Sequence, residues 1–523
     1  MSKTRAVWLF IGALTIVRLS MLGSTDLEFD EAHYWMWSER LAPAYFSKGP
    51  GIAFALRAST ALFGATEFGV RFWSPILAGG SSLFLFYLGK RLFSENVGLW
   101  TVIAFNVTPI FNIGAFVITT DGLSIFFWVA AMFAFWIAIE KTPRFTLWWP
   151  LTGLLIGVGF LSRYTNAFEI VSILLVLVFV PRLRPEFKRP ALYSLLGTFL
   201  VCTIPPIVWN KQHAWITLLH LKTRGGLAEE VGFNPLEPLK FFGEHFIFYS
   251  PLLFAALVWG VLGNWRRVNQ QFKISFLFWF GLPVFAFYFM ISINHVATPN
   301  WDAVSFIGFG LLAVYYWHER VANRGVRIFA TSAILLGFVI SLFSLDSDIL
   351  RSAGFHFWRS DPSDRLRGWK SMVGEVEKIR GDLEAKLGEK LFMIADERHR
   401  ASEVSFYLKD KRIEGPGHPP CYLVESQDLI NQFSFWPRYD QFVDQPAKNN
   451  EAAEEIFTEQ KGVNLFVGRS ALFIRNWGKH PPHNIAAAFE SVEPVGTIEL
   501  RRFGKHVRYW ELFLCRHYRT LPL

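Results

Sequence analysis

Charged residues are scarce in this chain of 523 residues. They make up 18% of it, whereas hydrophobic residues make up 52% and the mean hydropathy is +0.28. A soluble domain carries about 25% charged residues. Aromatic residues are in excess at 17%, with 54 Phe and 21 Trp, which is typical of lipid-facing helices and interfacial belts. The composition excludes an ordinary soluble enzyme and a disordered chain, and it predicts a membrane protein.

Cysteine is also rare, with three residues in the whole chain. Cys202 lies in a hydrophobic run, whereas Cys421 and Cys515 lie in the polar C-terminal part. So few cysteines exclude a small disulfide scaffold, and their spacing matches no zinc site. In an oxidising compartment the C-terminal pair would form a disulfide only if the fold brought the two residues together. The sequence leaves a disulfide and two free thiols equally open.

The C-terminal part has no excess of basic over acidic residues. Residues 1–344 hold 26 Lys or Arg and 17 Asp or Glu, and residues 345–523 hold 26 of each, so the whole net charge of +9 lies in the hydrophobic part. Nucleic-acid binding needs basic residues gathered on a polar face, so we expect no nucleic-acid partner. The positive-inside rule of membrane proteins accounts for the excess.

Eleven hydrophobic runs are long enough to cross a bilayer, which takes about 17–25 residues. They are 7–23, 69–89, 96–116, 120–139, 147–162, 165–181, 191–208, 241–262, 273–293, 301–317 and 327–344. The first run is interrupted by Arg18 and lacks a small-residue cleavage site, so we interpret it as a retained helix rather than a signal peptide.

Every alternate short loop between these runs is basic. Together with Lys3 and Arg5, these loops hold 16 of the 26 basic residues and four acidic ones. The sequence therefore predicts a multi-pass protein of the cell inner membrane with a cytoplasmic N-terminus and a periplasmic tail. We expect a transmembrane domain over 1–344 and a soluble domain over 345–523.

The tail has a mixed pattern. Residues 391–395 and 463–467 are expected to form strands, 400–408 a short helix, and 497–502 with 507–514 a closing pair of strands. The whole fold class is then a polytopic α-helical membrane protein with a C-terminal mixed α/β domain.

Unusual polar residues gather in the predicted outer loops and turns. They are Asp30, Glu31, His33, Tyr45, Lys48, Asp121, Arg163, Tyr164, His213 and Asn300. Each has a structural interpretation: Asp121 as a helix cap, Lys48 and Arg163 as headgroup anchors, and the histidines as packed side chains. Arg18 and Glu169 lie inside spans, where ionisable residues pair with other polar groups or serve a function.

Because these polar residues converge on one membrane face, a catalytic role is favoured over separate structural roles. A carboxylate can bind an acceptor and remove its proton, and Lys and Arg can hold a phosphate. A single displacement at a sugar carbon needs this combination, because a neutralised phosphate leaves without a general acid. A lipid-linked sugar phosphate also explains why such a site lies at the membrane.

Several segments carry a resemblance to a known family. They are 29–35 (FDEAHYW), 45–50 (YFSKGP), 119–121 (TTD), 161–165 (LSRYT), 209–215 (WNKQHAW), 299–301 (PNW) and, in the tail, 395–408. Together they resemble the GT-C glycosyltransferases, and within them the bacterial relatives of protein O-mannosyltransferases. That branch includes lipid A aminoarabinose transferases and lipopolysaccharide galacturonic acid transferases.

The resemblance implies a GT-C fold and an inverting transferase that uses a polyprenyl-phosphate sugar and a lipid or glycan acceptor at the membrane. It implies that Asp30 activates the acceptor, that Glu31 is its partner, and that Asp121 is the second acidic position. Lys48 matches a lysine that contacts the donor phosphate, and Arg163 keeps the charge of a position that is often Lys.

The complete set of candidate residues follows from these matches. Asp30, Glu31 and Asp121 are the catalytic candidates, and Lys48, Arg163 and Tyr164 the donor-phosphate candidates. His33, Tyr45, His213 and Asn300 are the candidates for other substrate contacts.

The chain also departs from the family pattern. Many relatives have His-Pro-Pro where this chain has Lys48-Gly49-Pro50, which favours the aminoarabinose-type branch. That branch carries an acidic residue, a suspected metal ligand, where this chain has Ser47. We therefore expect no metal and no other cofactor.

Three alternatives remain open at this level. A lipid-linked sugar flippase or exporter would share the span count, but it would more naturally place polar residues at the bilayer midplane. A sensor or scaffold would bind without turnover. Within the enzyme class, protein O-mannosylation competes with modification of lipid A or lipopolysaccharide, and neither the sugar nor the acceptor is written in these residues.

Overall fold

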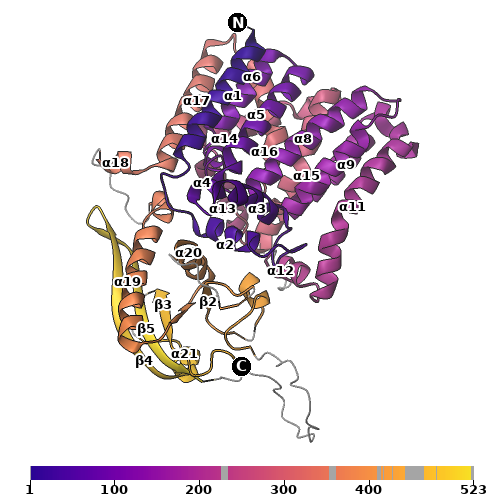
Figure 1. The fold of residues 1–523 in the computed structure, drawn as a ribbon. Helices are drawn as coiled ribbons and strands as arrows, with labels where there is room; N and C mark the ends of the chain where they lie inside the picture. The colour runs from indigo at the N-terminus through magenta and orange to yellow at the C-terminus, as the bar shows by residue number, and fades with distance from the viewer. Residues whose placement is uncertain are drawn as a thin grey trace, which may run out of the picture. The chain divides into compact units, whose positions relative to one another are not determined.

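The structure is a computed structural model of the chain. It describes residues 2–224, 234–352, 361–408, 414–415, 417–426, 428–441, 464–476, 478 and 480–519. The chain divides into two compact units (Figure 1). The first comprises Met1–Ser24 and Leu41–Ser363, and the second comprises Thr25–Arg40 and Asp364–Leu523. The expected domain division at 344/345 stays a prediction.

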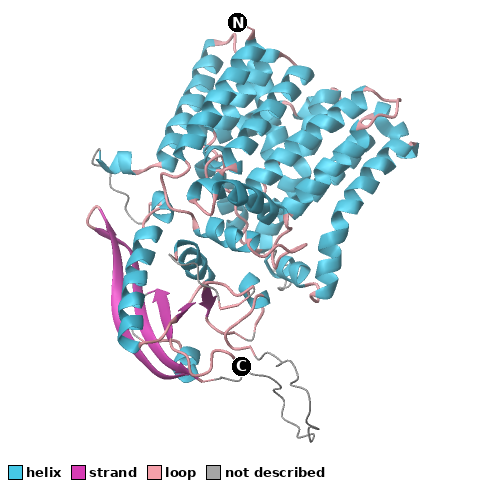
Figure 2. Ribbon diagram, viewed as in Figure 1, coloured by secondary structure: helices cyan, strands magenta, loops and turns pink. Residues whose placement is uncertain are grey.

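The described part of the first unit is helical (Figure 2). Its α-helices are α1 (Lys3–Met21), α3 (Gly51–Phe63), α4 (Glu67–Arg71), α5 (Trp73–Leu92), α6 (Glu95–Val107), α7 (Pro109–Ile113), α8 (Thr120–Glu140), α9 (Trp148–Ser162), α10 (Phe168–Phe179), α11 (Pro190–Gln212), α12 (Ile216–Arg224), α13 (Leu236–Phe248), α14 (Pro251–Gly263), α15 (Phe272–Asn294), α16 (Ser305–His318), α17 (Arg324–Leu345) and α18 (Asp348–Ser352). Short 3-10 helices are η1 (Tyr164–Ala167), η2 (Pro181–Lys188) and η3 (Trp265–Arg267).

Among the described residues, six helical segments are long and apolar enough to cross a membrane, or eight if each of two bent helix pairs counts as one span. The expected count of eleven is not confirmed. The run 241–262 illustrates the difference, because it is broken into α13 and α14 with a bend of 117°. Pro251 begins α14 and disfavours a helical residue before it, and Ser250 accordingly has a φ of 72°.

The core of the bundle is aromatic. Trp128 and Phe135 of α8 are fully buried. The Phe135 ring lies 5.7 Å from that of Trp149 and 6.1 Å from that of Phe280. Such edge and offset contacts add to the free energy of apolar burial.

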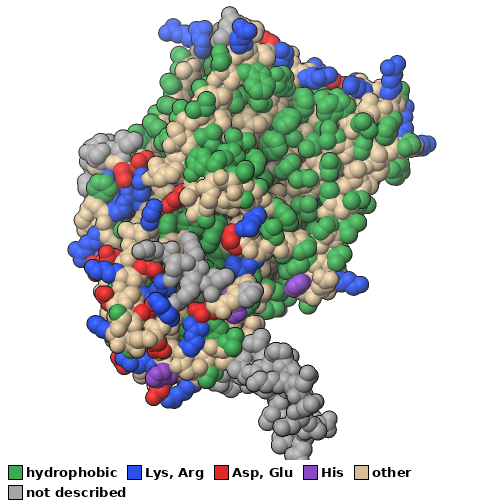
Figure 3. Space-filling model, viewed as in Figure 1, with side chains coloured by type: hydrophobic (Ala, Val, Ile, Leu, Met, Phe, Trp, Pro, Cys, Tyr) green, Lys and Arg blue, Asp and Glu red, His purple; other side chains and the backbone are tan. Residues whose placement is uncertain are grey.

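The two ends of the bundle differ in charge. α8 has 21 residues and is therefore about 31 Å long, close to the thickness of the hydrocarbon core. At its last residue, Glu140 binds Arg91 at 2.6 Å. Lys3 binds Asn96 of the neighbouring α6 at 2.6 Å. Basic side chains gather at this end, beyond a broad hydrophobic band (Figure 3), as the alternation of basic loops predicts.

Two ionisable residues inside spans have polar partners. The Arg18 guanidinium donates to the side-chain oxygens of Asn106 and Asn112 at 2.9 and 2.7 Å. Glu169 is fully buried and accepts from Asn166 at 3.3 Å. Arg18 therefore joins α1 to α6 and α7. Glu169 is linked to α8 through Asn166, which bonds to Ser124.

The second unit contains a five-stranded sheet with the order β2-β1-β3-β5-β4. Its strands are β1 (Phe392–Ala395), β2 (Cys421–Leu423), β3 (Ala471–Asn476), β4 (Phe489–Arg502) and β5 (Lys505–Tyr518), and its helices are α2 (Phe29–Ser38), α19 (Trp369–Leu387), α20 (Arg398–Tyr407) and α21 (His483–Ala488). β1 pairs in parallel with β2 and β3, and β5 pairs antiparallel with β3 and β4. The expected strand at 391–395, helix at 400–408 and closing strand pair are confirmed as β1, α20 and β4–β5.

The strand expected at 463–467 is wrong. Val463 lies outside the described residues, and the next residues form a turn in which the Asn464 side chain accepts from the backbone N–H of Phe466 at 2.8 Å. Such an Asx turn competes with strand formation. Leu465 and Val467 are 61% and 53% exposed, whereas Phe466 between them is buried in the core. The strand β3 begins only at Ala471.

The two C-terminal cysteines are buried free thiols. Cys421 lies on β2 and Cys515 on β5, with β1 and β3 between them. Three strand spacings of about 4.8 Å put the residues about 14 Å apart, whereas a disulfide needs Cα atoms within about 7 Å. The fold excludes a disulfide between them.

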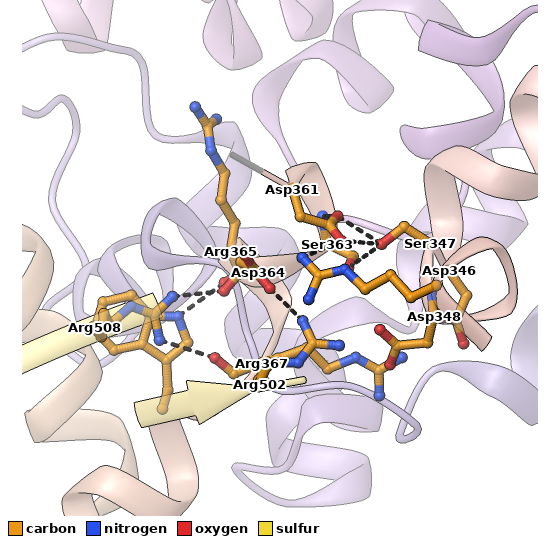
Figure 4. Close-up of polar contacts among 12 residues, drawn as sticks. Asp346, Ser347, Asp348, Asp361, Ser363, Asp364, Arg365, Arg367, Arg502 and Arg508 are labelled. Carbon is orange, nitrogen blue, oxygen red and sulfur yellow. Dashed lines mark hydrogen bonds and ion pairs between the residues drawn. The ribbon is translucent and has the colours of Figure 1, made fainter. Parts of the chain in front are cut away.

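Helix α2 is held within the second unit by contacts on both sides. The backbone N–H of Leu27 donates to the Tyr407 hydroxyl at 2.8 Å, and the Arg40 guanidinium donates to the Gly417 and His418 carbonyls at 2.6 and 2.5 Å. Arg508 similarly fixes the start of the tail by donating to the backbone carbonyls of Asp364 and Arg367 (Figure 4).

Candidate functional site

In the first unit, predicted site residues meet at the N-terminal end of α8. The Thr119 hydroxyl caps this helix by accepting from the Asp121 N–H at 3.2 Å. The cap places Asp121 in the first turn, where the helix dipole favours a carboxylate. Thr119, and not Asp121, therefore supplies the side-chain cap of this helix. The Asp121 carboxylate contacts other groups.

Arg163 connects Asp121 with Asn300. It directly follows α9, its guanidinium forms an ion pair with the Asp121 carboxylate, and it donates to the Asn300 carbonyl at 3.1 Å. The Asn300 amide lies 3.4 Å from the other Asp121 oxygen. Arg163 and Asp121 are 14% and 21% exposed, so the pair is accessible from one side.

Lys48 reaches the same helix end. Its ammonium group donates to the Thr120 hydroxyl at 3.1 Å. The loop that carries it packs closely on the end of α9, because a Cβ at Gly49 would lie 2.2 Å from the Leu161 carbonyl oxygen. Only glycine permits this approach, so the Lys48-Gly49-Pro50 motif brings a cation to the segment that carries Arg163.

A buried pair that sequence patterns do not predict lies close to this cluster in the chain. His245 of α13 and Asp302 are both fully buried, and the imidazole Nε2 lies 3.1 Å from the carboxylate. The imidazole Nδ1 lies 2.7 Å from the Phe241 carbonyl, which only accepts, so Nδ1 carries a proton. The Nε2 contact therefore also needs a proton, on the histidine or on the acid.

This pair holds the segment that carries Asn300. Asp302 lies two residues after Asn300, and His245 lies next to the bend between α13 and α14. Four aromatic rings surround the imidazole: those of Phe241, Tyr249, Phe254 and Phe306. A histidine and an aspartate almost 60 positions apart become recognisable as a pair only through the fold.

The remaining predicted residues of the first unit have different surroundings. The Tyr164 hydroxyl is buried and has no hydrogen-bond partner within the described chain. Tyr45 is fully buried, and its hydroxyl accepts from the Ala42 N–H at 3.2 Å, which orders the loop before Lys48. His213 stacks on Trp209 with ring centroids 4.0 Å apart and contacts the Trp209 carbonyl at 2.8 Å.

In the second unit, Asp30 and Glu31 form the first turn of α2. Glu28 caps the helix by accepting from the Asp30 N–H at 2.8 Å, and Glu31 accepts from the Glu28 N–H at 2.9 Å, which completes a capping box. Glu31 is fully buried, whereas the Asp30 side chain is 38% exposed and lies 3.9 Å from Arg398. Of the two carboxylates, Asp30 is the one that a substrate can reach.

His33 is buried beside Ser402 of α20. Its Nε2 accepts from the Trp37 indole N–H at 3.2 Å, and its Nδ1 lies 3.0 Å from the Ser402 hydroxyl. Since indole only donates, Nε2 is unprotonated and the ring is neutral. Burial lowers the pKa of His33 well below its usual value, in agreement with this assignment.

A buried acid faces the same helix from α20. Glu403 is fully buried, and neither carboxylate oxygen has a hydrogen-bond partner within the described residues. Burial, and next the charge of Glu28, raise the pKa of Glu403 well above its usual value. Burial and the charge of Asp30 raise the pKa of Glu28 from 4.5 to about 8. The first turn of α2 thus lies among acids that favour their protonated forms.

Within the described chain, no group of three or more His, Cys, Asp or Glu side chains is placed to hold a metal ion.

Comparisons with known proteins agree with this architecture. The family model of dolichyl-phosphate-mannose-protein mannosyltransferases matches residues 47–209. The chain is 27% identical over 426 residues to the lipid A galacturonosyltransferase RgtD of Rhizobium johnstonii, covering 81% of this chain and 86% of that protein. It is 24% identical to the undecaprenyl phosphate-alpha-4-amino-4-deoxy-L-arabinose arabinosyl transferase of Serratia proteamaculans, covering 60% and 58%.

Solved structures show the same fold. The ArnT protein from Cupriavidus metallidurans bound to undecaprenyl phosphate aligns with a TM-score of 0.62 and 14% identity over 97% of both chains. The apo form of that protein gives a TM-score of 0.58 over 98% of both chains.

Proposed function

We propose that this chain is a multi-pass membrane glycosyltransferase of the GT-C superfamily that transfers a sugar from a polyprenyl-phosphate donor to lipid A or a related envelope glycan. The observation that carries the proposal is the cluster of Lys48, Asp121, Arg163 and Asn300 at one end of the bundle. Two cations and one carboxylate give this cluster a net charge of +1, which matches the single negative charge of a sugar phosphodiester.

The cluster favours departure of the phosphate. When the bond between the anomeric carbon and the phosphate oxygen breaks, the phosphate becomes a monoester with a charge near −1.5 to −2. Lys48 and Arg163 then interact more strongly with the leaving group than with the bound donor, which lowers the barrier. Asp121 and the Asn300 carbonyl hold the guanidinium in place, and the Tyr164 hydroxyl is a further donor for a phosphate oxygen.

Asp30 is proposed as the general base. The acceptor hydroxyl oxygen attacks the anomeric carbon, its proton passes to the Asp30 carboxylate, and polyprenyl phosphate leaves with inversion at that carbon. Asp30 suits this role because its side chain is partly exposed and is fixed to a capped helix turn. Glu31 supports it by closing the capping box and His33 packs helix α2 within the second unit. In the first unit, Tyr45 orders the loop before Lys48 and His213 is a candidate sugar contact.

The names of the relatives suggest which substrates to test. Galacturonic acid and 4-amino-4-deoxy-L-arabinose are the sugars named for the two curated relatives, and lipid A is the acceptor named for the first. The family match also names a protein as acceptor. We place lipid A first because that relative covers most of the chain.

The proposal includes an orientation. We infer an inner-membrane protein with its N-terminus in the cytoplasm and its tail in the periplasm. The gathering of basic loops at one end of the bundle, opposite the end of α8 that carries Asp121, supports this orientation.

Transfer by the purified protein tests the function. The protein in vesicles is given undecaprenyl-phosphate galacturonic acid or undecaprenyl-phosphate aminoarabinose together with lipid A or an acceptor peptide. We expect one donor to yield a glycosylated lipid A and stoichiometric undecaprenyl phosphate. Movement of an intact donor across the vesicle membrane without release of undecaprenyl phosphate would instead identify an exporter.

A further inference from the structure

A second polar cavity opens at the opposite end of the bundle from Asp121. It has a volume of about 790 Å³ and lies between the end of α8, η2 and the start of α15. Its lining includes Trp136, Glu140, Thr142, Arg182, Arg189 and Lys273. None of these residues belongs to the proposed transfer site.

The charges of this cavity do not cancel. Glu140 is bound by Arg91 at 2.6 Å and by the Trp136 indole at 2.6 Å, and Arg189 is paired with Glu186. Two cations remain, Arg182 and Lys273.

Both of these cations lack a carboxylate partner within the described residues. The Arg182 guanidinium lies 3.8 Å from the centroid of the Phe272 ring, and the Lys273 ammonium donates to the Leu92 carbonyl. The cavity therefore presents two uncompensated positive charges beside the hydroxyl of Thr142.

This arrangement suits a phosphate that belongs to a lipid. Arg and Lys bind phosphate oxygens strongly, and basic pockets between membrane helices bind anionic headgroups. The end of α10, just before Arg182, exposes Val178 and Phe179 at 44% and 45%. This exposed apolar surface precedes Arg182 closely in the sequence and suits acyl chains, which a free ion does not have.

We propose that this cavity binds the headgroup of an anionic phospholipid, with its phosphate held by Arg182 and Lys273 and its acyl chains along Val178 and Phe179. The site does not depend on sugar transfer, because it lies at the far end of α8.

Lipid titration tests the site. The full-length protein in a nonionic detergent is titrated with short-chain phosphatidylglycerol, with the matching phosphatidylcholine and with inorganic phosphate, and binding is read by native mass spectrometry. We expect wild type to bind phosphatidylglycerol at least about tenfold more tightly than Arg182→Gln/Lys273→Gln. The control Arg5→Gln/Arg324→Gln removes the same charge from exposed positions at this end of the bundle, and it should bind like wild type.

Three results would overturn the proposal. They are equal phosphatidylglycerol affinity in wild type and the double variant, equal binding of phosphatidylcholine by wild type, and displacement of the lipid by inorganic phosphate at comparable concentrations. If the double variant does not fold, the two single variants are titrated, and each should bind about threefold more weakly than wild type.

Discussion

At the scale of single residues, Arg163 is the cation that connects two other candidate residues of the first unit, Asp121 and Asn300. Its guanidinium contacts the Asp121 carboxylate and the Asn300 carbonyl. A planar fork of donors suits this double contact together with a phosphate, whereas an ammonium supplies only a point charge. Arg suits this position better than Lys because its planar guanidinium can donate to several acceptors at once.

We predict that Arg163→Gln lowers kcat/KM for transfer by about 10²–10³, since it removes one stabilising donor from the developing charge. Arg163→Lys should recover part of the loss because it restores the charge without the fork. Steady-state kinetics with the purified protein measures both. Arg144→Gln, an exposed change in a loop at the other end of α8, is the control, and an Arg163→Gln enzyme as fast as this control would exclude Arg163 from phosphate binding.

We also predict that Asp302→Asn and His245→Ala destabilise the protein and slow transfer together. Removing one partner leaves the other polar group buried without its hydrogen bond, which costs about 1–3 kcal/mol, and the segment carrying Asn300 loses its anchor. Thermal unfolding and kinetics are measured on each variant. If the pair positions Asn300, kcat falls in the variants while donor KM changes less, and His245→Gln recovers part of kcat. Wild-type kcat in the folded variants would refute this role.

The residue types of the site were predictable from the sequence, but their partners were not. Lys48, Asp121, Arg163 and Asn300 fall in loops and turns that the sequence predicts on one face, so the predicted topology indicates that they approach one another. The pairing of each carboxylate with a cation depends on where the helices end, and hydropathy does not predict these ends precisely. The His245–Asp302 pair was not predictable, because a single histidine in a hydrophobic run does not indicate its partner.

At the scale of elements, close approach of the 48–50 loop to α9 positions Lys48. A Cβ at Gly49 would lie 2.2 Å from the backbone of Leu161, whereas a Cβ at Gly197 of α11 meets nothing within 4 Å. Substitution of Gly49 by alanine therefore tests the close approach, and substitution of Gly197 by alanine is its control.

We predict that Gly49→Ala reduces transfer by about tenfold or more because the loop must move away from α9 and carries the Lys48 ammonium with it. Gly197→Ala should leave transfer unchanged and slightly raise stability, since alanine favours a helix interior. Activity and thermal unfolding of both variants check this. Full activity of Gly49→Ala would show that the position of the loop is not critical.

The acid cluster at α2 and α20 predicts a pH dependence of stability. Burial raises the pKa of Glu28 to about 8 and raises the pKa of Glu403 well above its usual value. Below about pH 4.5 these carboxyls are protonated in both the folded and the unfolded chain. As the pH rises towards 8 the unfolded chain loses the protons first, so the stability of the folded state falls.

Glu403→Gln mimics the protonated acid, and we expect its melting temperature to fall less than that of wild type between pH 5 and pH 9. Glu397→Gln changes an exposed acid near the start of α20 and should keep the wild-type slope. Thermal unfolding at five pH values measures the slopes. Identical slopes for wild type and Glu403→Gln would contradict the assignment of Glu403 as a neutral buried acid.

Element boundaries show where sequence patterns stop being sufficient. The strand β1 follows a continuous apolar run, β4 and β5 follow patterned segments, and all three were predictable. Residues 464–467 are also mostly apolar, but they form a turn in which the Asn464 side chain accepts from the Phe466 N–H. Likewise the run 241–262 is continuous in hydropathy, and only the Ser250–Pro251 backbone reveals its bend.

At the scale of the whole molecule, composition and loop charge were sufficient to predict a membrane bundle with a separate α/β tail. The assignment of helix α2 to the second unit was not predictable, because it rests on hydrogen bonds from Leu27 and Arg40 to residues almost 400 positions away. The helix that carries Asp30 is thus folded together with the C-terminal part. The tail is therefore part of the support of the proposed base.

The most direct test of the account is mass spectrometry of lipid A, core polysaccharide and surface glycans. A deletion strain is compared with strains restored by wild type, by Asp30→Asn, or by Glu39→Gln as a control at the other end of α2. We predict loss of one sugar mass on deletion, restored by wild type and Glu39→Gln but not by Asp30→Asn, although that variant accumulates in the membrane. Restoration by Asp30→Asn to the wild-type level would contradict the proposed base, and unchanged glycans in the deletion strain would contradict the proposed transfer to the envelope.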